Sequence, residues 1–328
     1  MNQEMKSVIE LQEIFNNYLA EQSFEKQPKE LYEPFNYILS LGGKRMRPIM
    51  VLLGCEMFSN KGETALSQAI AIELFHNFSL IHDDIMDNAP MRRGKPTVHE
   101  KYNKNVGILS GDVMLIYAYE YLLCNSGVKT EQLVQLFNKT AIEVCEGQQL
   151  DMNFENEMYV SVNDYLKMIE LKTAVLLGSA LKMGSIIGGA KEQDAQKIYE
   201  VGRLLGIAFQ LQDDLLDSFG DVKKFGKQLG GDIIQNKKTI LLIEAIENAS
   251  TEQRNQLITW LEKKNFDPKE KVNSIMDLYY QLNIQDIVEK KMLKYYNEAL
   301  TNLDEIDIPE INKSGLRRFA ELLLVRES

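Results

Sequence analysis

Two aspartate clusters share one spacing, and their residue type points to divalent metal chemistry. The first is the segment 83–87, DDIMD, and the second is the segment 213–217, DDLLD. In each cluster the first and last carboxylates are four residues apart, so on a helix they share one face about one turn apart. Neither span contains a basic residue that could offset the repulsion between its acids. Mg²⁺ is the natural partner, because it binds a few carboxylates together with water and substrate phosphates.

Either cluster alone could be a solvated acidic helix end, which needs no metal. Two matched copies inside long apolar segments favour a functional interpretation, because surface acids normally alternate with lysine or arginine. We therefore predict two carboxylate metal sites, one at each cluster.

Basic residues follow each cluster closely. After the first come Arg92, Arg93 and Lys95, on the turn that ends the helix. The planar guanidinium group of arginine suits phosphate oxygens, so acids, metal and arginines together would form a diphosphate clamp. The simpler alternative is that both arginines only neutralise the acids. After the second come the segments 225–232, FGKQLGGD, and 236–239, NKKT, whose glycines permit close backbone approach and whose lysines supply positive charge.

A third basic group lies upstream, in the segment 42–48, GGKRMRP. It places three cations within four residues, Lys44, Arg45 and Arg47. They would repel one another unless an anion joins them, although solvated loops of this kind are common. The sequence thus predicts two metal-type sites and one metal-free basic site, which leaves room for two different phosphorylated ligands.

Composition places further bounds on the function. The 328-residue chain has 45% apolar residues, seven prolines and 20 glycines, which describes a helical globular protein with a sizeable core. Its net charge of −11 and pI near 5.0 argue against nucleic-acid binding. The three cysteines have no metal-ligand spacing and fit a reducing compartment. The sequence shows no segment of signal-peptide type and no uncharged run of transmembrane length, so we expect a cytoplasmic protein that is not membrane-integral.

Helical periodicity sets the expected fold. Apolar residues recur at three- and four-residue spacing almost everywhere, and convincing strand alternation is absent. Ser250 and Gln253 form a capping-box signature at the start of one helix. No linker rich in Pro, Gly or Ser divides the chain, so we predict an all-α fold with a single domain over residues 1–328. The helices are expected at about 5–22, 29–39, 46–59, 64–88, 106–124, 130–157, 163–188, 192–218, 238–249, 251–264, 269–302 and 315–326.

Taken together, these motifs resemble those of the trans-isoprenyl diphosphate synthases, the family of farnesyl and geranylgeranyl diphosphate synthases. The resemblance runs from Gly42 to about Thr239, and the closing segment 323–326, LLVR, is also typical. It rests on segments in family order: GGKRMRP, HDDIMD, RRGKPT, GQQLD, LKT, FQLQDDLLD, and GKQLGGD with NKKT. The resemblance implies a large helical bundle of isoprenoid synthase type around a deep central cavity, open at the metal end.

The resemblance also implies roles for individual residues. Three Mg²⁺ ions would be held by Asp83, Asp87, Asp151, Asp213 and Asp217. The catalytic set would further include Asp84, Asp214, Lys172, Thr173 and Gln210, with Thr173 and Gln210 near the developing carbocation. The allylic diphosphate would contact Arg92, Lys172, Thr173, Gln210, Lys227 and Lys237. Isopentenyl diphosphate would bind without metal at Gly43, Lys44, Arg47, His76 and Arg93. An extra lysine, Lys238, follows Lys237, and which of the two reaches phosphate is open.

The implied reaction is a head-to-tail condensation of isopentenyl diphosphate with an allylic diphosphate. Diphosphate leaves only when its charge is neutralised, which the metal ions and basic side chains would do. The allylic cation left behind is reactive, so the site must exclude water. The isopentenyl double bond then attacks, and proton loss, with the departing diphosphate as base, completes the reaction.

Product length is expected to depend on the helix that carries the first cluster. In family terms, the positions four and five before the motif decide the floor of the cavity, here Ser79 and Phe78. Helix geometry places Ser79 directly below Asp83 and Phe75 one further turn down, roughly 12 Å below Asp83, whereas Phe78 lies off this line. We predict a C20 product, with C15 or a longer chain as the alternatives.

Three other functions deserve comparison. Class I terpene cyclases also carry an Asp-rich motif, but they typically have an Asn/Ser/Glu motif in place of the second cluster and lack the GGKRMRP cations. A di-iron bundle would match Glu73 and His76 as Glu-x-x-His, yet the second half of that pattern is missing. A non-catalytic prenyltransferase subunit would usually lose acidic or cationic motifs, and all are present here. We expect a homodimer, both from the resemblance and from apolar helices such as 106–124.

Overall fold

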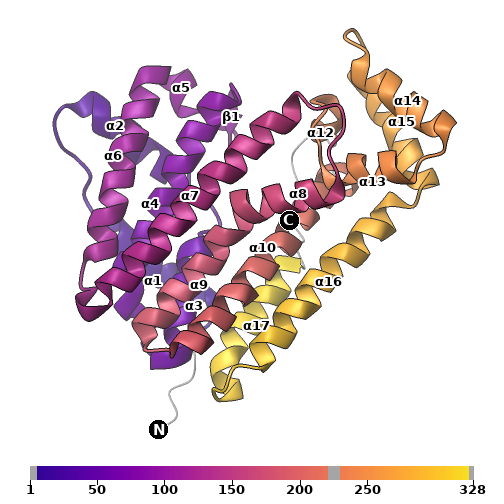
Figure 1. Ribbon diagram of the computed structural model, residues 1–328. Helices are drawn as coiled ribbons and strands as arrows, with labels where there is room; N and C mark the ends of the chain where they lie inside the picture. Colours follow the sequence, from indigo (N-terminus) through magenta and orange to yellow (C-terminus); the bar gives the residue numbers. More distant parts are fainter. Residues whose placement is uncertain (1–5, 221–229, 325–328) are drawn as a thin grey trace. The chain divides into compact units, whose positions relative to one another are not determined.

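Helices build nearly all of the structure, a computed structural model that describes residues 6–220 and 230–324 (Figure 1). The predicted all-α fold is confirmed. Lys227 lies outside the described residues. Contacts divide the chain into two compact units. Unit 1 comprises Met1–Thr140, Leu177–Tyr199 and Ile306–Phe319, and unit 2 comprises Ala141–Leu176, Glu200–Glu305 and Ala320–Ser328. That the chain is one domain stays a prediction.

Unit 1 is built mainly from the first 140 residues of the chain. Its elements are α1 (Val8–Ala20), α2 (Lys29–Ser40), α3 (Met46–Ser59), the 3₁₀ turn η1 (Gly62–Ala65), α4 (Leu66–Met86), the strands β1 (Met91–Arg92) and β2 (Lys95–Pro96), α5 (Val98–Lys101), α6 (Lys104–Leu123) and the 3₁₀ turn η2 (Gly127–Lys129). Four helices contribute residues to both units, namely α7 (Thr130–Glu155), α9 (Val175–Gly188), α10 (Glu192–Phe219) and α17 (Glu310–Leu324).

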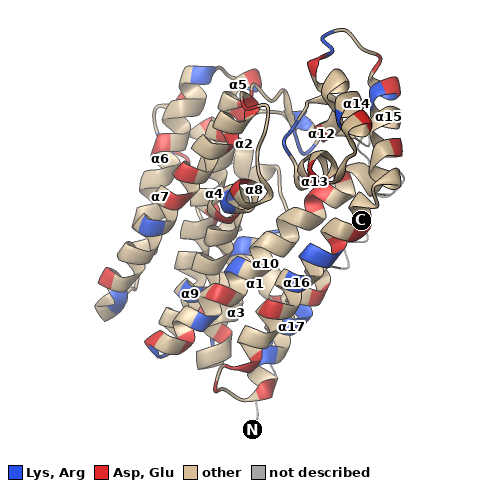
Figure 2. Ribbon diagram, turned by 45° about the vertical axis from the view of Figure 1, so that its right-hand side comes forward, with Lys and Arg blue, Asp and Glu red and all other residues tan. Residues whose placement is uncertain are grey.

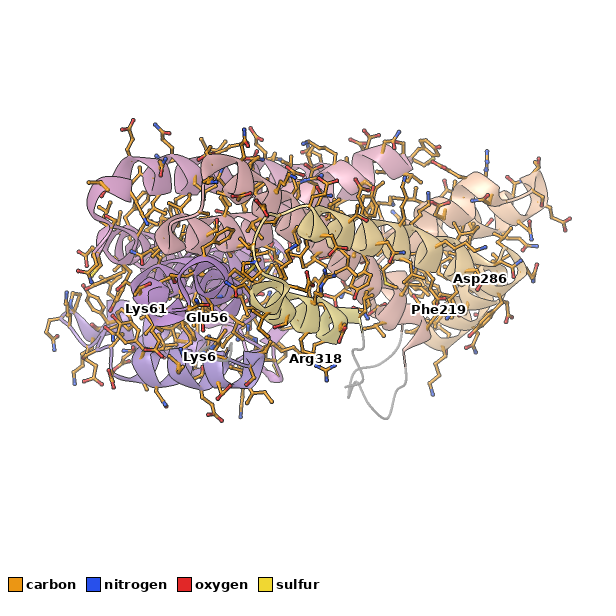
Figure 3. All side chains as sticks on the ribbon, turned by 90° about the horizontal axis from the view of Figure 1, so that it is seen from below. Lys6, Glu56, Lys61, Phe219, Asp286 and Arg318 are labelled. Atoms are coloured by element: carbon orange, nitrogen blue, oxygen red, sulfur yellow. The ribbon has the colours of Figure 1, made fainter. Side chains whose placement is uncertain are left out.

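The core of unit 1 surrounds α4. This helix packs along α6 and against α3, and nearly all of its first half is buried. Helix α3 is itself buried along most of its length because α9 lies unusually close to it. A Cβ on Gly184 of α9 would lie 1.9 Å from the Val51 carbonyl oxygen, so only glycine permits this approach. Lys6, labelled beside Glu56 in Figure 3, ties the start of the described chain to α3 through a 3.8 Å ion pair.

Unit 2 contains α8 (Val162–Ile169), the π-helical turn η3 (Glu170–Ala174), α12 (Gly231–Ile234), α13 (Ile240–Asn248), α14 (Thr251–Glu262), α15 (Pro268–Gln281) and α16 (Ile284–Asp304). Its core is formed by apolar side chains from α8, α10, α13, α15 and α16. Phe219, labelled in Figure 3, ends α10 and packs on Tyr279 of α15, with ring centroids 6.4 Å apart. The predicted capping box of α14 is present, with Ser250 and Gln253 bonding to each other's backbone.

The structure corrects several predicted elements. The single helix expected over 269–302 is two helices, because Asn283 adopts a left-handed conformation (φ 52°) between α15 and α16. The helix expected over 163–188 contains the π-helical turn η3. The helix expected at 315–326 begins earlier, at Glu310. The hairpin β1–β2 and the short helices α5 and α12 were not predicted, because such brief elements leave no periodic signal.

Two helical stretches are long and apolar enough to cross a membrane when judged only by length and composition. In the most apolar 18-residue segment of Val162–Gly188, 78% of the residues are buried, as expected for a core helix. In the most apolar 18-residue segment of α6, only 33% of the residues are buried. Its exposed apolar side chains include Leu109, 57% exposed, and Ile116, 60% exposed.

Candidate active site

The first aspartate cluster lies at the carboxyl end of α4, in unit 1. Asp84 is buried, and Arg92 of β1 donates three hydrogen bonds of 2.7–3.0 Å to its carboxylate. Asp83 is partly exposed and lies 4.0 Å from the same guanidinium group, and Asp87 is exposed. Burial alone would lower the pKa of Arg92, but the hydrogen bonds and charge of Asp84 raise it overall. Arg92 therefore pairs with the middle carboxylate of the cluster, as the simpler alternative of charge neutralisation would have it.

A two-residue hairpin turn places the arginines. Strands β1 and β2 pair Arg92 with Lys95, and both turn residues have positive φ, 52° at Arg93 and 73° at Gly94. Such turns match the twist of the two strands. The guanidinium group of Arg93 donates to the Gly42 carbonyl, and a Cβ on Gly43 would lie 2.9 Å from Arg93 Cζ. The glycines of GGKRMRP therefore let this basic loop accept the hairpin arginine.

Arg47 and His76 meet in the same unit. Arg47 Nη1 lies 3.1 Å from His76 Nε2. Burial lowers the pKa of His76 well below its usual value, and the positive charges of Arg47, Arg93, Arg92 and Arg45 lower it further. The ring is therefore neutral at physiological pH and can accept a hydrogen bond from Arg47. The structure thus brings together four of the five residues predicted for isopentenyl diphosphate, namely Gly43, Arg47, His76 and Arg93. The fifth, Lys44, lies in the loop between Gly43 and Arg47.

A buried ion pair beneath this basic loop was not predicted. Arg45, at φ 49°, turns inward to form an ion pair with Glu73 and donates to the Leu39 carbonyl at 2.8 Å. Asn77, one turn along α4, donates to the Glu73 carboxylate at 3.0 Å. The sequence contained one signal for this arrangement, an acid at position 73 inside an apolar helix. Arg45 thus anchors the basic loop, while its neighbours Lys44 and Arg47 stay the predicted ligand-binding cations.

The second cluster lies on α10 in unit 2 and repeats the burial pattern of the first. Asp214, its middle acid, is 4% exposed, whereas Asp213 and Asp217 are partly exposed. The Asp214 carboxylate accepts from the Tyr165 hydroxyl, from Gln210 Nε2 at 3.2 Å and from the Ile240 amide at 3.3 Å. Desolvation raises the pKa of Asp214 to about 7. Tyr165 was not predicted, because an isolated tyrosine at the start of an amphipathic helix carries no signal.

Asp217 connects α10 to the segment that carries the predicted lysines. The Asp232 amide donates to Asp217 Oδ2 at 3.0 Å, and the Gly230 amide donates to the Asp217 carbonyl at 2.8 Å. Lys237, 58% exposed at its side chain, lies 3.5 Å from Asp232 Oδ1. Acidic and basic residues gather around α12 (Figure 2). The second cluster and Lys237 therefore belong to one local assembly.

The π-helical turn η3 presents Lys172 and Thr173. Lys172 Nζ lies 2.5 Å from Asp151 Oδ2, and Thr173 Oγ1 donates to Gln210 Oε1 at 3.3 Å. A Cβ on Gly147 of α7 would lie 2.2 Å from the Lys172 amide nitrogen, so this glycine lets η3 contact α7 directly. Single π turns within α-helices are frequent at functional sites. Two pairs of residues predicted from GQQLD, LKT and FQLQDDLLD are thus in contact, Lys172 with Asp151 and Thr173 with Gln210.

Aromatic side chains close off the region below the first cluster in unit 1. Phe75 is 2% exposed, and its ring centroid lies 5.7 Å from that of Phe78 and 5.3 Å from that of Phe137 on α7. Phe137 in turn lies 4.9 Å from Tyr119 on α6. Ser79 donates to the His76 carbonyl. The predicted floor residues Phe75 and Phe78 are adjacent, and Phe137 and Tyr119, which sequence reasoning missed, extend them across two further helices.

The donor set of both clusters suits a hard divalent ion. Every candidate ligand is a carboxylate, and the acids at the two ends of each cluster are more exposed than the one between them. Over residues 6–220 and 230–324, no three His, Cys, Asp or Glu side chains form a ready metal cage. In Mg²⁺ sites generally, few carboxylates bind and water or substrate phosphate completes the shell.

Comparison with known proteins agrees with this geometry. The family model for polyprenyl synthetase matches residues 28–279. A geranylgeranyl diphosphate synthase of Methanosarcina mazei is 36% identical over 304 residues, 92% of this chain and 91% of that protein. A geranylfarnesyl diphosphate synthase of Natronomonas pharaonis is 38% identical over 258 residues, 73% of this chain and 75% of that protein.

Solved structures show the same fold. A geranylgeranyl pyrophosphate synthase is similar with a TM-score of 0.94 and 43% identity, covering 99% of this chain and 100% of that one. The geranylgeranyl pyrophosphate synthetase of Pyrococcus horikoshii has a TM-score of 0.91 and 34% identity, with 98% and 97% covered. The chain therefore belongs to the polyprenyl synthetase family. The predicted family, fold class and prenyltransferase class are all confirmed.

Proposed function

We propose that this protein is a short-chain trans-prenyltransferase that condenses isopentenyl diphosphate with allylic diphosphates and releases geranylgeranyl diphosphate, a C20 product. One observation carries the proposal. Each aspartate cluster has a buried middle acid fixed by protein groups, Asp84 by Arg92 and Asp214 by Tyr165, and more exposed acids at either end. This is the arrangement that a metal-dependent diphosphate site requires, because the buried acid orients the helix and its outer neighbours can reach metal.

We infer that Asp83, Asp87, Asp213 and Asp217, with Asp151 in support, hold Mg²⁺. When bound, the ions neutralise the diphosphate and so lower the barrier to its departure. The family resemblance assigns four basic residues to the diphosphate, to which they would supply further positive charge: Arg92, Lys172, Lys227 and Lys237. Thr173 and Gln210 present oxygens that stabilise positive charge on the allyl carbon. Apolar neighbours keep water from the cation.

The second substrate, isopentenyl diphosphate, would occupy the basic loop of unit 1. The residues of this site would supply hydrogen-bond donors and positive charge, and none of them is a carboxylate that could bind metal: Gly43, Lys44, Arg47, His76 and Arg93. A neutral His76 suits this role, because it orients Arg47 and adds no charge that must be compensated. Two chemically different diphosphate sites are what a condensation needs and what a cyclase lacks.

The aromatic floor supports a product of limited length. Phe75, Phe78, Phe137 and Tyr119 form a connected group that would stop a growing chain a few prenyl units below the acids. Relatives named geranylgeranyl diphosphate synthase favour C20. Relatives named geranylfarnesyl diphosphate synthase make a longer product the main alternative, with C15 the other.

Product analysis tests this function directly. Purified protein would be incubated with Mg²⁺, labelled isopentenyl diphosphate, and dimethylallyl, geranyl or farnesyl diphosphate in turn, and the products separated by chromatography. We expect a C20 diphosphate from all three primers and no activity after chelation of the metal. A terpene cyclase would incorporate no label, and an inactive protein would point to a non-catalytic subunit. Asp112→Asn, a change in an exposed acid of α6, is the matched control for Asp83→Asn.

A further inference from the structure

Lys271 of α15 is an unusual residue, because it is fully buried. Its relative exposure is 0%, and among the described residues no carboxylate lies within ion-pair distance of it. Lysine is almost never fully buried unless it is paired. Its ammonium group donates instead to two neutral oxygens, the Ile234 carbonyl at 3.3 Å and the side-chain oxygen of Asn236, and it lies 4.3 Å from the centre of the Phe266 ring.

Both oxygens belong to the segment that carries Lys237. Ile234 is the last residue of α12, and Asn236 turns the chain at φ 57° immediately before Lys237 and Lys238. Asn236 is held from its other side as well, since its amide group donates to the Leu261 carbonyl at 3.0 Å. Lys271 therefore fixes the middle of the turn from Gly230 to Ile240, here called the lysine turn.

The second aspartate cluster holds the two ends of this turn. Asp217 accepts the amides at its start, as described above, and Asp214 accepts the Ile240 amide at its end, 3.3 Å away. Lys271 provides a third attachment, from a different helix. The ammonium groups at this turn belong to Lys237, Lys238 and Lys271, and burial together with nearby Lys238 lowers the pKa of Lys271. Asp232, 3.5 Å from Lys237, offsets part of this charge, and Asp214 and Asp217 accept backbone amides at the two ends of the turn, so an anionic ligand is favoured at the lysines between them.

We propose that Lys271 is a positioning residue for the allylic diphosphate, which it serves by fixing the lysine turn through Ile234 and Asn236. This inference rests on the proposed function. A purely structural lysine could be replaced by an apolar side chain of similar size with little effect on substrate binding, because a buried charge is costly to keep. A positioning lysine cannot be replaced, because the turn would then lose its contact with Ile234 and one of the two contacts that hold Asn236 beside Lys237.

Steady-state kinetics can separate the two cases. In Lys271→Met we expect the KM for farnesyl diphosphate to rise about tenfold, because a misplaced binding group weakens substrate capture, while the KM for isopentenyl diphosphate stays within about twofold, since that site lies in unit 1. Lys269→Met, a change in an exposed lysine two residues away, should alter neither value. Lys271→Arg, which retains charge and donors, should recover part of the loss.

A second variant tests the same contact in case Lys271→Met does not fold. Asn236→Gly keeps the left-handed backbone but removes the oxygen that Lys271 contacts, together with the amide group that donates to Leu261, and we expect the same selective rise in the KM for farnesyl diphosphate. Because the two residues share one contact, their combined effect should be smaller than the product of the single effects. If both variants fold and neither shifts this KM, or if both KM values rise equally, the inference is wrong. A wild-type protein that makes no prenyl product would instead overturn the proposed function.

Discussion

At the scale of single residues, the middle acid of each cluster is buried and held by protein groups, whereas the two outer acids are more exposed. Asp84 is held by Arg92, and Asp214 by Tyr165, Gln210 and the Ile240 amide. The sequence alone makes all the aspartates equivalent, because the difference arises from partners 4 to 49 residues away. The repeated pattern DDxxD thus encodes one structural acid and two candidate metal ligands.

Metal dependence should follow this division. We expect Asp83→Asn and Asp217→Asn each to lower kcat by at least about 10²-fold and to raise the Mg²⁺ concentration needed for half-maximal rate, because each removes charge from the metal shell. The measurement is a magnesium titration of the condensation rate, with Asp112→Asn as control. Unchanged magnesium curves in both variants would contradict the ligand assignment.

Glu73 is expected to matter for stability. Removing one partner of a buried ion pair leaves an uncompensated charge, so Glu73→Gln should reduce the free energy of unfolding by about 3–5 kcal/mol. Urea denaturation measures this loss. Glu63→Gln changes an exposed acid that pairs with Lys6 at 3.3 Å, and it should cost less than about 1 kcal/mol. Equal losses in the two variants would show that the Arg45–Glu73 pair has no special role.

His76 should make stability depend on pH. Its folded-state pKa is lowered by burial and by the neighbouring arginines, so below the ordinary histidine value the unfolded chain binds a proton that the folded chain does not. Stability should therefore fall as pH drops below about 6.5, by at most about 1.4 kcal/mol per pH unit from this group. His76→Gln should flatten this part of the curve, measured by urea denaturation from pH 7 to 5. His82→Gln, on the same helix, is the control, and an equal flattening there would contradict the assignment.

At the scale of elements, the long helices were predictable and their interruptions were not. The bounds of α3, α6 and α14 fall within two residues of the expected ones, because their apolar spacing and caps are local signals. Asn283 breaks the expected helix over 269–302 through a left-handed residue that periodicity cannot show. The π turn η3 depends on Gly147, which lies far from it in sequence and lets α7 approach. The unpredicted parts of the site are thus those fixed by contacts between elements.

The predicted floor of the cavity depends on one such contact, between Phe75 of α4 and Phe137 of α7. Phe75→Ala and Phe137→Ala each remove one ring of the Phe75–Phe137 pair, and we expect both to shift the product from C20 toward longer chains, because each removes a barrier below the acids. Each change also costs about 3–5 kcal/mol of stability, so products should be compared by chromatography at a temperature where all variants are folded. If both variants, and Phe78→Ala, leave the product unchanged, the floor lies elsewhere.

At the scale of the whole molecule, the exposed apolar side chains of α6 bear on the predicted homodimer. Helix α6 is apolar enough to resemble a membrane span. Four of its apolar side chains are between 41% and 60% exposed, namely Ile108, Leu109, Ile116 and Leu123. Contiguous exposed apolar surface of this kind commonly marks an interface. We propose that a second copy of the chain covers it, as expected for the homodimer, and that the protein is not integral to a membrane.

Charge placed on α6 should test this assembly. A buried, unpaired carboxylate at an apolar interface is strongly unfavourable, so Ile116→Asp should convert the dimer to monomer, with a dissociation constant raised by at least about 100-fold. Analytical ultracentrifugation over a concentration series gives the oligomeric state. Ile311→Asp places the same charge on α17, at a residue 58% exposed, and should leave the dimer intact. A dimer that survives Ile116→Asp would show that another surface pairs the subunits, whereas a wild-type protein recovered only with detergent would instead assign the α6 face to lipid.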